Sequence, residues 1–255
     1  EGERFRLGFS RPVELAWMET ALAYAREGLP EAEIRGLLDQ LPSPFCAGGR
    51  SHNGRRKIVQ ILMRTWVRPP EELKPLRDEA LALSRDVPPA LHIVFHWGMT
   101  GAVFPFFLEV AETTGRLLRI QEDFSAGQIV RRIGERFGDL PAVKKATEAA
   151  LQTFLSWRVV KQETDHLMKA APPLIVERPD VAGWLLSAML FAHEDRRLPQ
   201  EKLMFTPRLF PFKIPPETFY RALEETRRLR IVMHGLNQAL VVVRDEAANS
   251  GKRPS

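Results

Sequence analysis

A charge-free stretch of 22 residues, Val87 to Leu108, lies in the middle of the chain, and any fold has to remove it from water. A membrane-spanning helix needs about 20 mostly apolar residues, so the length alone fits one. However, the stretch contains His92, His96 and Pro105, and no positive cluster beside it fixes an orientation. We therefore expect a buried core helix rather than a membrane span, and we expect Pro105 to kink or end it.

The composition is typical of a soluble globular protein. Of its 255 residues, 44% are hydrophobic and 27% are charged, which is enough apolar sequence for a real core. The net charge of +5 and the many arginines favour an anionic partner. The single cysteine, Cys46, excludes an internal disulfide framework and fits a reducing compartment. No signal peptide is visible in the opening residues, so we expect a cytoplasmic protein.

Apolar residues at helical spacing predict helices over most of the chain. The expected helices cover residues 11–28 and 29–41, then 55–66 and 106–120, then 125–138 and 142–157, and finally 178–194 and 215–229. A loop is expected at residues 42–54 and an irregular, proline-rich connector at 195–217. The sequence thus predicts a mostly α protein.

Two regions have the outline of a winged helix-turn-helix. In residues 119–165, Ser125 is placed to cap a helix, a short "GDLP" turn leads to a second helix, and a strand follows as the start of a wing. The last third repeats this outline and ends in a predicted hairpin at 230–244 around a "GLN" turn. We therefore expect tandem helix-turn-helix or winged-helix-like units with short β-hairpin wings. The expected division is a unit at 1–85, a second at 86–170, a third at 171–246 and a disordered tail at 247–255.

The segment "SHNGRRKIVQILMRTW", residues 51–66, begins with a basic cap that invites comparison with a phosphate-binding loop. Gly49 and Gly54 have the spacing of the G-x-x-x-x-G-K-[ST] motif. Arg55 and Arg56 stand where that motif has its lysine and its hydroxyl residue, and no apolar strand precedes the loop. Without those two side chains the chemistry of the motif is missing, so we do not expect a nucleotide-hydrolysing loop.

The same segment fits nucleic-acid binding better. Residues 40–70 contain six cations and no anion. On a helix, Arg56, Gln60 and Arg64 share one face, whereas the apolar residues of the segment fall on another. Arginine suits bidentate contacts to phosphate or guanine. An ordinary solvated basic face remains the alternative.

A second basic patch accompanies the helix pair at 125–157, although Glu148 on the second helix weakens a purely phosphate-binding interpretation. We expect the cations of the two patches to hold the DNA backbone, with Gln60 as a candidate base contact. The predicted DNA-binding residues are Arg50, Arg55, Arg56, Lys57, Gln60, Arg64, Arg131, Lys144, Lys145 and Lys161.

Catalytic motifs are not apparent in the sequence. His92 and His96 are one helical turn apart, as in a zinc pair, but the glutamate of H-E-x-x-H is missing and the surrounding residues are apolar. We expect them to be core histidines. There is no G-x-S-x-G motif, and Cys46 has no neighbouring base. We therefore expect a protein that is not an enzyme and that uses no cofactor or metal.

Four segments carry a resemblance to a known family. They are "VELAWMETALAYAREGLPEAEIRGLLDQL", "GRRKIVQILMRTWVRPPEELKPLRDEAL", "LHIVFHWGMTGAVFPFFLEVA" and "SAGQIVRRIGERFGDLPAVKKATEAALQTFLSWRVV". In this order they resemble the BrxA family of BREX phage-defence systems, over about residues 10–165. The resemblance implies a small helical, non-enzymatic protein with winged-helix-like units that binds DNA. The chain departs from it by extending well past residue 170 with a second wing-like hairpin.

These observations predict a protein that binds double-stranded DNA, chiefly through phosphates, within a defence system and away from membranes. Two alternatives remain. One is an adaptor that docks other defence-system subunits, and the other is a winged-helix transcriptional regulator.

Overall fold

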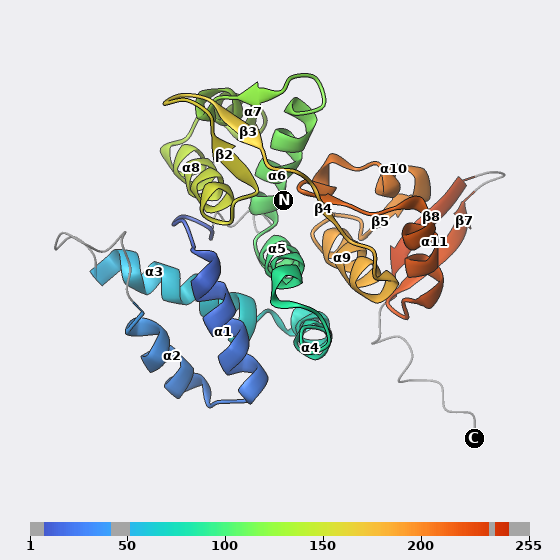
Figure 1. Ribbon diagram of the computed structural model, residues 1–255, viewed down its shortest axis with the longest axis horizontal. Coiled ribbons are helices and arrows are strands. Elements are labelled where there is room, and N and C mark those ends of the chain that lie inside the picture. The colour runs from blue at the N-terminus through green and yellow to red at the C-terminus, as the bar shows by residue number, and fades with distance from the viewer. Residues whose placement is uncertain (1–7, 42–51, 235–237, 245–255) are drawn as a thin grey trace.

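The computed structural model describes residues 8–41, 52–234 and 238–244, and in these residues the chain is mostly helical (Figure 1). They form 11 α-helices together with short strands in small sheets and hairpins. This confirms the predicted mostly α class. The proposed disordered tail and the "GLN" turn lie outside the described residues.

The charge-free stretch forms the centre of the molecule. Helix α5 (His92–Val103) is buried along its whole length, and α6 (Pro105–Leu117) follows after a single residue. The two helices are bent by 116° relative to each other. Pro105 is the first residue of α6, where its missing N–H costs nothing, so it ends one helix and begins the next as expected.

In the described residues no single helix is long and apolar enough to cross a membrane. The segments Pro89–Val103 and Pro105–Leu117 pass that test of length and composition only as a bent pair.

The N-terminal part consists of helices of which α1 and α4 pack against α5. They are α1 (Leu15–Glu27), α2 (Glu31–Asp39), α3 (His52–Leu62) and α4 (Lys74–Leu83). α1 ends at Gly28, which has a left-handed φ of 71° that suits glycine. Residues 52–54, predicted as loop, belong to α3. The end of the predicted helix also differs, because Met63–Val67 form a π-helical turn in which the Arg68 N–H donates to the Met63 carbonyl at 2.8 Å.

The central part adds a three-stranded sheet to a pair of helices. Its elements are β1 (Asp123–Phe124), α7 (Ala126–Phe137), α8 (Pro141–Ser156), β2 (Val160–Gln162) and β3 (Met168–Ala170). All pairs are antiparallel and the order is β1-β3-β2. The predicted cap is confirmed, because the Gln128 N–H donates to Ser125 Oγ at 3.2 Å and the Ser125 N–H donates to Gln128 Oε1 at 2.7 Å.

The C-terminal part repeats the order of elements of the central part, if that order is counted from α6. It consists of α9 (Pro179–Phe191), β5 (Arg197–Pro199), α10 (Gln200–Met204), α11 (Pro216–Glu225), β7 (Leu229–His234) and β8 (Gln238–Val243). The sheet order is β5-β8-β7, and β7 with β8 is the predicted hairpin. The prediction of an irregular connector at 195–217 is wrong. That segment holds β5, α10, a 3-10 turn at Pro207–Leu209 and β6 (Phe212–Lys213).

Central and C-terminal parts therefore share one topology. Starting from α6 and from α9, each runs helix, strand, helix, helix, strand, strand, and in each the last strand lies between the other two. β6 is an addition in the second copy and pairs in parallel with β4 (Leu174–Ile175). Figure 1 shows the two copies at the top and the right of the molecule.

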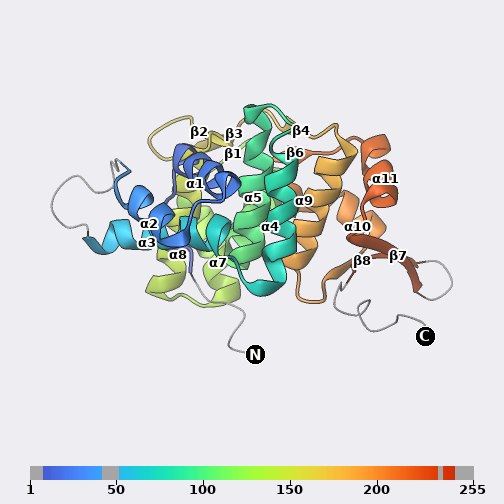
Figure 2. The same cartoon turned by 90° about the horizontal axis from the view of Figure 1, so that it is seen from below.

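One continuous core joins all three parts. Buried apolar residues from Phe9 to Val243 form a single cluster, and α5 packs against α9 at its centre (Figure 2). Trp184 of α9 is fully buried there, and its indole N–H donates to the Leu76 carbonyl of α4 at 2.9 Å. The parts thus support one another through shared burial.

Candidate nucleic-acid interface

The basic helix α3 presents the predicted polar face to solvent. Arg56, Lys57 and Gln60 are exposed. Ile58 and Ile61 are buried in the core, which fixes how the helix is rotated. Because Arg56 and Gln60 are one turn apart, they form a single strip on the outer side of α3.

Two of the predicted cations in this region are held by the protein itself. Arg55 donates to the carbonyl of Asp39, the last residue of α2, and so ties α2 to α3. The half-buried Arg64 guanidinium lies 5.6 Å from the ring centroid of Phe104, a cation–π distance. These side chains contribute positive charge but are less free to reach a ligand. The other predicted residue, Arg50, lies outside the described residues.

Helix α8 carries the second predicted patch. The buried residues Val143, Ala146 and Phe154 hold one side of α8 in the core. The opposite side exposes four polar side chains, Lys144, Lys145, Glu148 and Gln152. The structure therefore places both predicted lysines on the outer face, near the N-terminal end of the helix.

Arg131 of the neighbouring helix α7 is also exposed, and its guanidinium is 3.9 Å from Glu135 one turn away. That separation is at the outer limit of an ion pair, and exposed pairs of this kind contribute about 0.3–0.5 kcal/mol. Arg131 is therefore free to exchange this contact for another anion.

The β2–β3 hairpin adds a pair of lysines, of which only one was predicted from the sequence. Lys161, a predicted residue, lies directly opposite Lys169 across the hairpin, and Lys169 also pairs with Glu122 at 3.2 Å. Lys169 was missed because β3, the second strand of the hairpin, has only three residues and no clear alternation. Beyond the lysine pair the hairpin is acidic, with exposed Glu163 and Asp165.

A shallow hollow of about 300 Å³ separates the hairpin from the helices. Its walls come from the start of α7, the second half of α8 and the hairpin, and include Gly127, Gln152 and His166. An elongated partner lying along α8 would therefore contact the hairpin with one of its sides.

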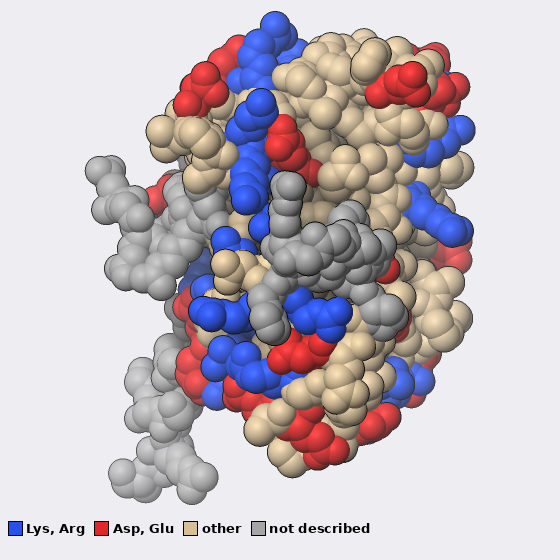
Figure 3. Space-filling model, turned by 90° about the vertical axis from the view of Figure 1, so that its left-hand side faces the viewer, with Lys and Arg blue, Asp and Glu red and all other residues tan. Residues whose placement is uncertain are grey.

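The two patches lie on the same side of the molecule. α3 and α8 are both on the left of the molecule in Figure 1 and are neighbours in Figure 2. Figure 3 shows this side, where Lys and Arg side chains follow one another in a broken band from the top to the middle, with some Asp and Glu beside them. The segment before α1 also contacts α8, because the Val13 N–H donates to Thr153 Oγ1 at 3.1 Å.

The histidine pair lies in the core rather than at the surface, as predicted. His92 Nδ1 and His96 Nε2 are 2.9 and 3.0 Å from different oxygens of Glu19. Burial lowers the pKa of His96, and Glu19 opposes this only in part. Burial acts to raise the pKa of Glu19, but the hydrogen bonds and charges of the two histidines outweigh it and the pKa is lowered. In the described part of the chain no group of three or more His, Cys, Asp or Glu side chains is placed to hold a metal ion.

Comparisons of the chain with protein-family models, with curated proteins and with solved structures found no match.

Proposed function

We propose that the protein binds double-stranded DNA without catalysing a reaction, and that its central part is a winged helix-turn-helix. The observation that carries the proposal is the repeated topology, helix, strand, helix, helix, strand, strand, with the last strand in the middle of the sheet. In helix-turn-helix proteins the second helix of the pair enters the major groove. In this proposal α8 is that second helix.

The side chains of α8 suit this role. Lys144 and Lys145 would hold phosphates at the edge of the groove, and Gln152 would reach a base edge. Glu148 has a use in the same model, because a carboxylate accepts a hydrogen bond from the N4 amino group of cytosine. Lys161 and Lys169 on the hairpin would contact the flanking backbone.

The α3 strip would extend the contact beyond α8. It lies on the same side of the molecule, and Arg56 and Lys57 are exposed there. Arginine and lysine at such positions neutralise phosphates and give affinity with little sequence preference. The resemblance to the BrxA family supports placing this activity in a phage-defence system, in the cytoplasm.

The C-terminal copy supports a second role, docking of another protein subunit. Its second helix, α11, exposes Glu217, Glu224 and Glu225, which would repel phosphates. The edge strand β7 exposes Ile231 and Met233, the latter by 63% of its surface. An apolar edge strand with free backbone groups is a common docking site for a protein strand. The two copies would thus divide DNA binding and subunit docking between them.

The test is a titration of a mixed-sequence 30-base-pair duplex by fluorescence anisotropy at several salt concentrations. We would compare the wild type with two double variants, Lys144→Ala/Lys145→Ala and Arg56→Ala/Lys57→Ala. Each lost phosphate contact lowers the slope of log K against log salt by about 0.9, so each variant should lose up to about 1.8. Circular dichroism would check that each variant is folded.

A matched control removes two exposed cations from the C-terminal part, Lys213→Ala/Arg230→Ala. This variant should bind DNA like the wild type. If the wild type does not bind DNA, or if the control loses as much affinity as the other variants, the proposed interface is wrong. A preference of about 4–10 kcal/mol for one sequence would favour the transcriptional regulator.

A further inference from the structure

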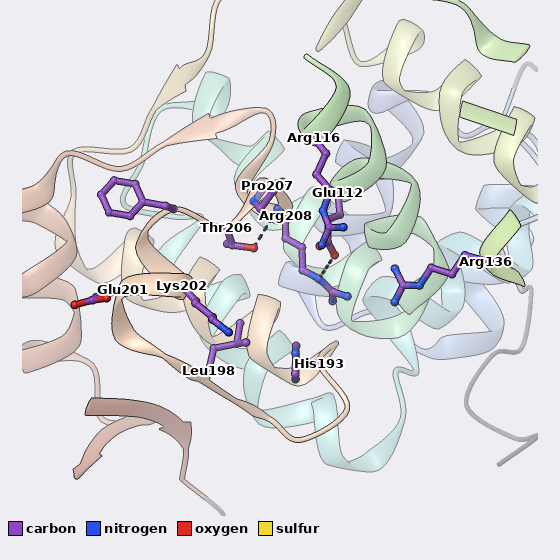
Figure 4. Close-up of a pocket in the computed structure, with 11 residues that line it drawn as sticks. Glu112, Arg116, Arg136, His193, Leu198, Glu201, Lys202, Thr206, Pro207 and Arg208 are labelled. Atoms are coloured by element: carbon purple, nitrogen blue, oxygen red, sulfur yellow. Dashed lines mark hydrogen bonds and ion pairs between the residues drawn. The ribbon is translucent and has the colours of Figure 1, made fainter. Parts of the chain in front are cut away.

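An open cleft of about 640 Å³ lies between the central and C-terminal parts (Figure 4). Glu112 and Arg116 of α6 and Arg136 of α7 line it from one part. Lys202 of α10 and Arg208 of the 3-10 turn line it from the other. Of these residues, only Arg136 is close in sequence to a DNA-binding residue proposed above. The volume of the cleft is in the range of small-molecule sites.

The two buried carboxylates of this region, Glu109 and Glu112, already have cationic partners. Arg208 Nε donates to Glu112 Oε2 at 2.6 Å, and its Nη2 donates to Glu109. Arg116 pairs with Glu112, and Arg136 pairs with Glu109. Burial acts to raise the pKa of Glu112, but the charges and hydrogen bonds of Arg208 and Arg116 together outweigh it and the pKa is lowered, so this carboxylate stays ionised. Three arginines thus share two carboxylates. Of the other charged side chains that line the cleft, Lys202 adds a positive charge and Glu201 a negative one, so one positive charge remains.

Two further observations indicate that the cleft would bind an anion. Lys202 is exposed at the cleft and makes no ion pair with another residue in the described part of the chain. Arg208 is 8% exposed, and its Nη1 is buried without a hydrogen-bond acceptor among the described residues. A buried guanidinium nitrogen normally has an acceptor. Figure 4 shows the Arg208 side chain between Glu112, Arg136 and His193, at the floor of the cleft.

An aromatic side chain stands at the same cleft. Phe205 lines it and is 67% exposed, whereas phenylalanine is among the residues most often buried. The Phe205 backbone is fixed, because Arg119 of the segment after α6 donates to its carbonyl at 2.5 Å. An exposed ring on an anchored backbone offers a surface on which a planar base can stack.

We propose that this cleft binds a nucleoside phosphate. The base would stack on Phe205, and the phosphates would be held by Lys202, Arg116 and Arg136 over the positive floor formed by Arg208. A ligand held in this way would touch the central and the C-terminal part at once. The proposal does not depend on DNA binding by α3 and α8.

The experiment is isothermal titration calorimetry of the full chain. The probes are ADP, GDP, CDP and UDP, each titrated separately, with inorganic pyrophosphate and adenosine for comparison. At least one diphosphate should bind more tightly than pyrophosphate, because stacking adds to the charge contacts. Phe205→Ala should weaken that diphosphate about tenfold and leave pyrophosphate unchanged, since stacking on one ring accounts for roughly this factor. Lys202→Ala should weaken both about three- to tenfold.

Two controls separate this site from the DNA-binding surface. Lys213→Ala removes an exposed lysine outside the cleft and should leave all affinities unchanged. Lys144→Ala/Lys145→Ala should also leave them unchanged, whatever it does to DNA binding. The proposal is overturned if no diphosphate binds at millimolar concentration. It is equally overturned if Phe205→Ala and Lys202→Ala have no effect, or if the Lys144 and Lys145 variant alone abolishes binding.

Discussion

At the scale of single residues, the arginines of this chain divide into those buried among carboxylates and those in solvent. Arg208 is buried and contacts Glu109 and Glu112, both of which are buried as well. Arg221 pairs with Glu225 on the exposed side of α11, one turn away. Removing one partner therefore has different consequences for the two ion pairs. Only at Arg208 would the remaining carboxylates be left buried and out of contact with water.

Arg208→Met should lower the free energy of unfolding by about 3–5 kcal/mol, the usual cost of leaving buried charges uncompensated. For a chain of this length, each kcal/mol shifts Tm by about 2–4 °C, so a fall of roughly 6–20 °C is expected. Arg221→Ala is the matched control and should change stability by no more than about 0.5 kcal/mol. Differential scanning calorimetry measures both, and an equal effect of the two substitutions would contradict the burial argument.

The buried histidine predicts how stability depends on pH. Folded His96 has a lowered pKa, so it stays neutral where the unfolded chain, with a value near 6.5, takes up a proton. The unfolded state then binds more protons, and the free energy of unfolding falls as the pH drops below about 6.5. Glu19 has a pKa lowered below its usual 4.5, so its stabilising contribution is lost as the pH falls below that value.

Urea denaturation at pH 7.5 and pH 5.5 measures the contribution of His96. The wild type should be less stable at pH 5.5, and His96→Gln should show a smaller difference between the two pH values, although it is less stable overall. His166→Gln, which changes an exposed histidine, should keep the pH dependence of the wild type. His193 adds a loss of the same sign in all three proteins, because burial and the charge of Arg208 lower its pKa. An unchanged pH dependence in His96→Gln would refute the prediction.

At the scale of elements, local sequence signals predicted most of the helices, although not α4 or α10, and among the strands only β2 and the β7–β8 hairpin. Gly28, Pro105 and Ser125 marked helix ends because capping depends on the nearest few residues. β1 and β5 were missed because each has two or three residues and exists only by pairing with a strand far along the chain. The π-helical turn at Met63–Val67 likewise has no periodic signal of its own.

The crossing of α5 and α9 depends on one glycine. A Cβ at Gly98 would lie 2.5 Å from the Trp184 side chain and 3.1 Å from the Ala188 Cβ. Trp184 is fully buried, so it has little room to move. Gly98→Ala should therefore cost about 1–3 kcal/mol, as expected for overpacking in a filled core.

Gly36 in α2 is the matched control, because a Cβ there meets nothing within 4 Å. Gly36→Ala should stabilise the protein by about 0.5–1 kcal/mol, since alanine has the higher helix propensity. Chemical denaturation of both variants measures the difference. If Gly98→Ala proved as stable as Gly36→Ala, the two helices would have to be further apart than they are here.

At the scale of the whole molecule, the candidate interface could be predicted only in part. The sequence identified the exposed cations Arg56, Lys57, Lys144 and Lys145, because the spacing of apolar residues within a helix is enough to predict which face is polar. It did not show that α3 and α8 lie on one side, since that depends on how the N-terminal helices pack against the central part. The cleft around Arg208 was missed for the same reason, because its walls come from segments that are 96 to 99 residues apart in the chain.

The common side of α3 and α8 leads to a prediction about stoichiometry and additivity. If one duplex lies across both helices, the Arg56→Ala/Lys57→Ala and Lys144→Ala/Lys145→Ala pairs each lower its salt slope, and the quadruple variant loses the sum, about 3.6. Their free-energy effects on binding should add, because the pairs are separate and share no partner. The wild type should bind one 30-base-pair duplex per chain in sedimentation velocity, and so should each double variant. Two duplexes bound by the wild type, with one lost in each double variant, would instead mean that α3 and α8 act as independent sites.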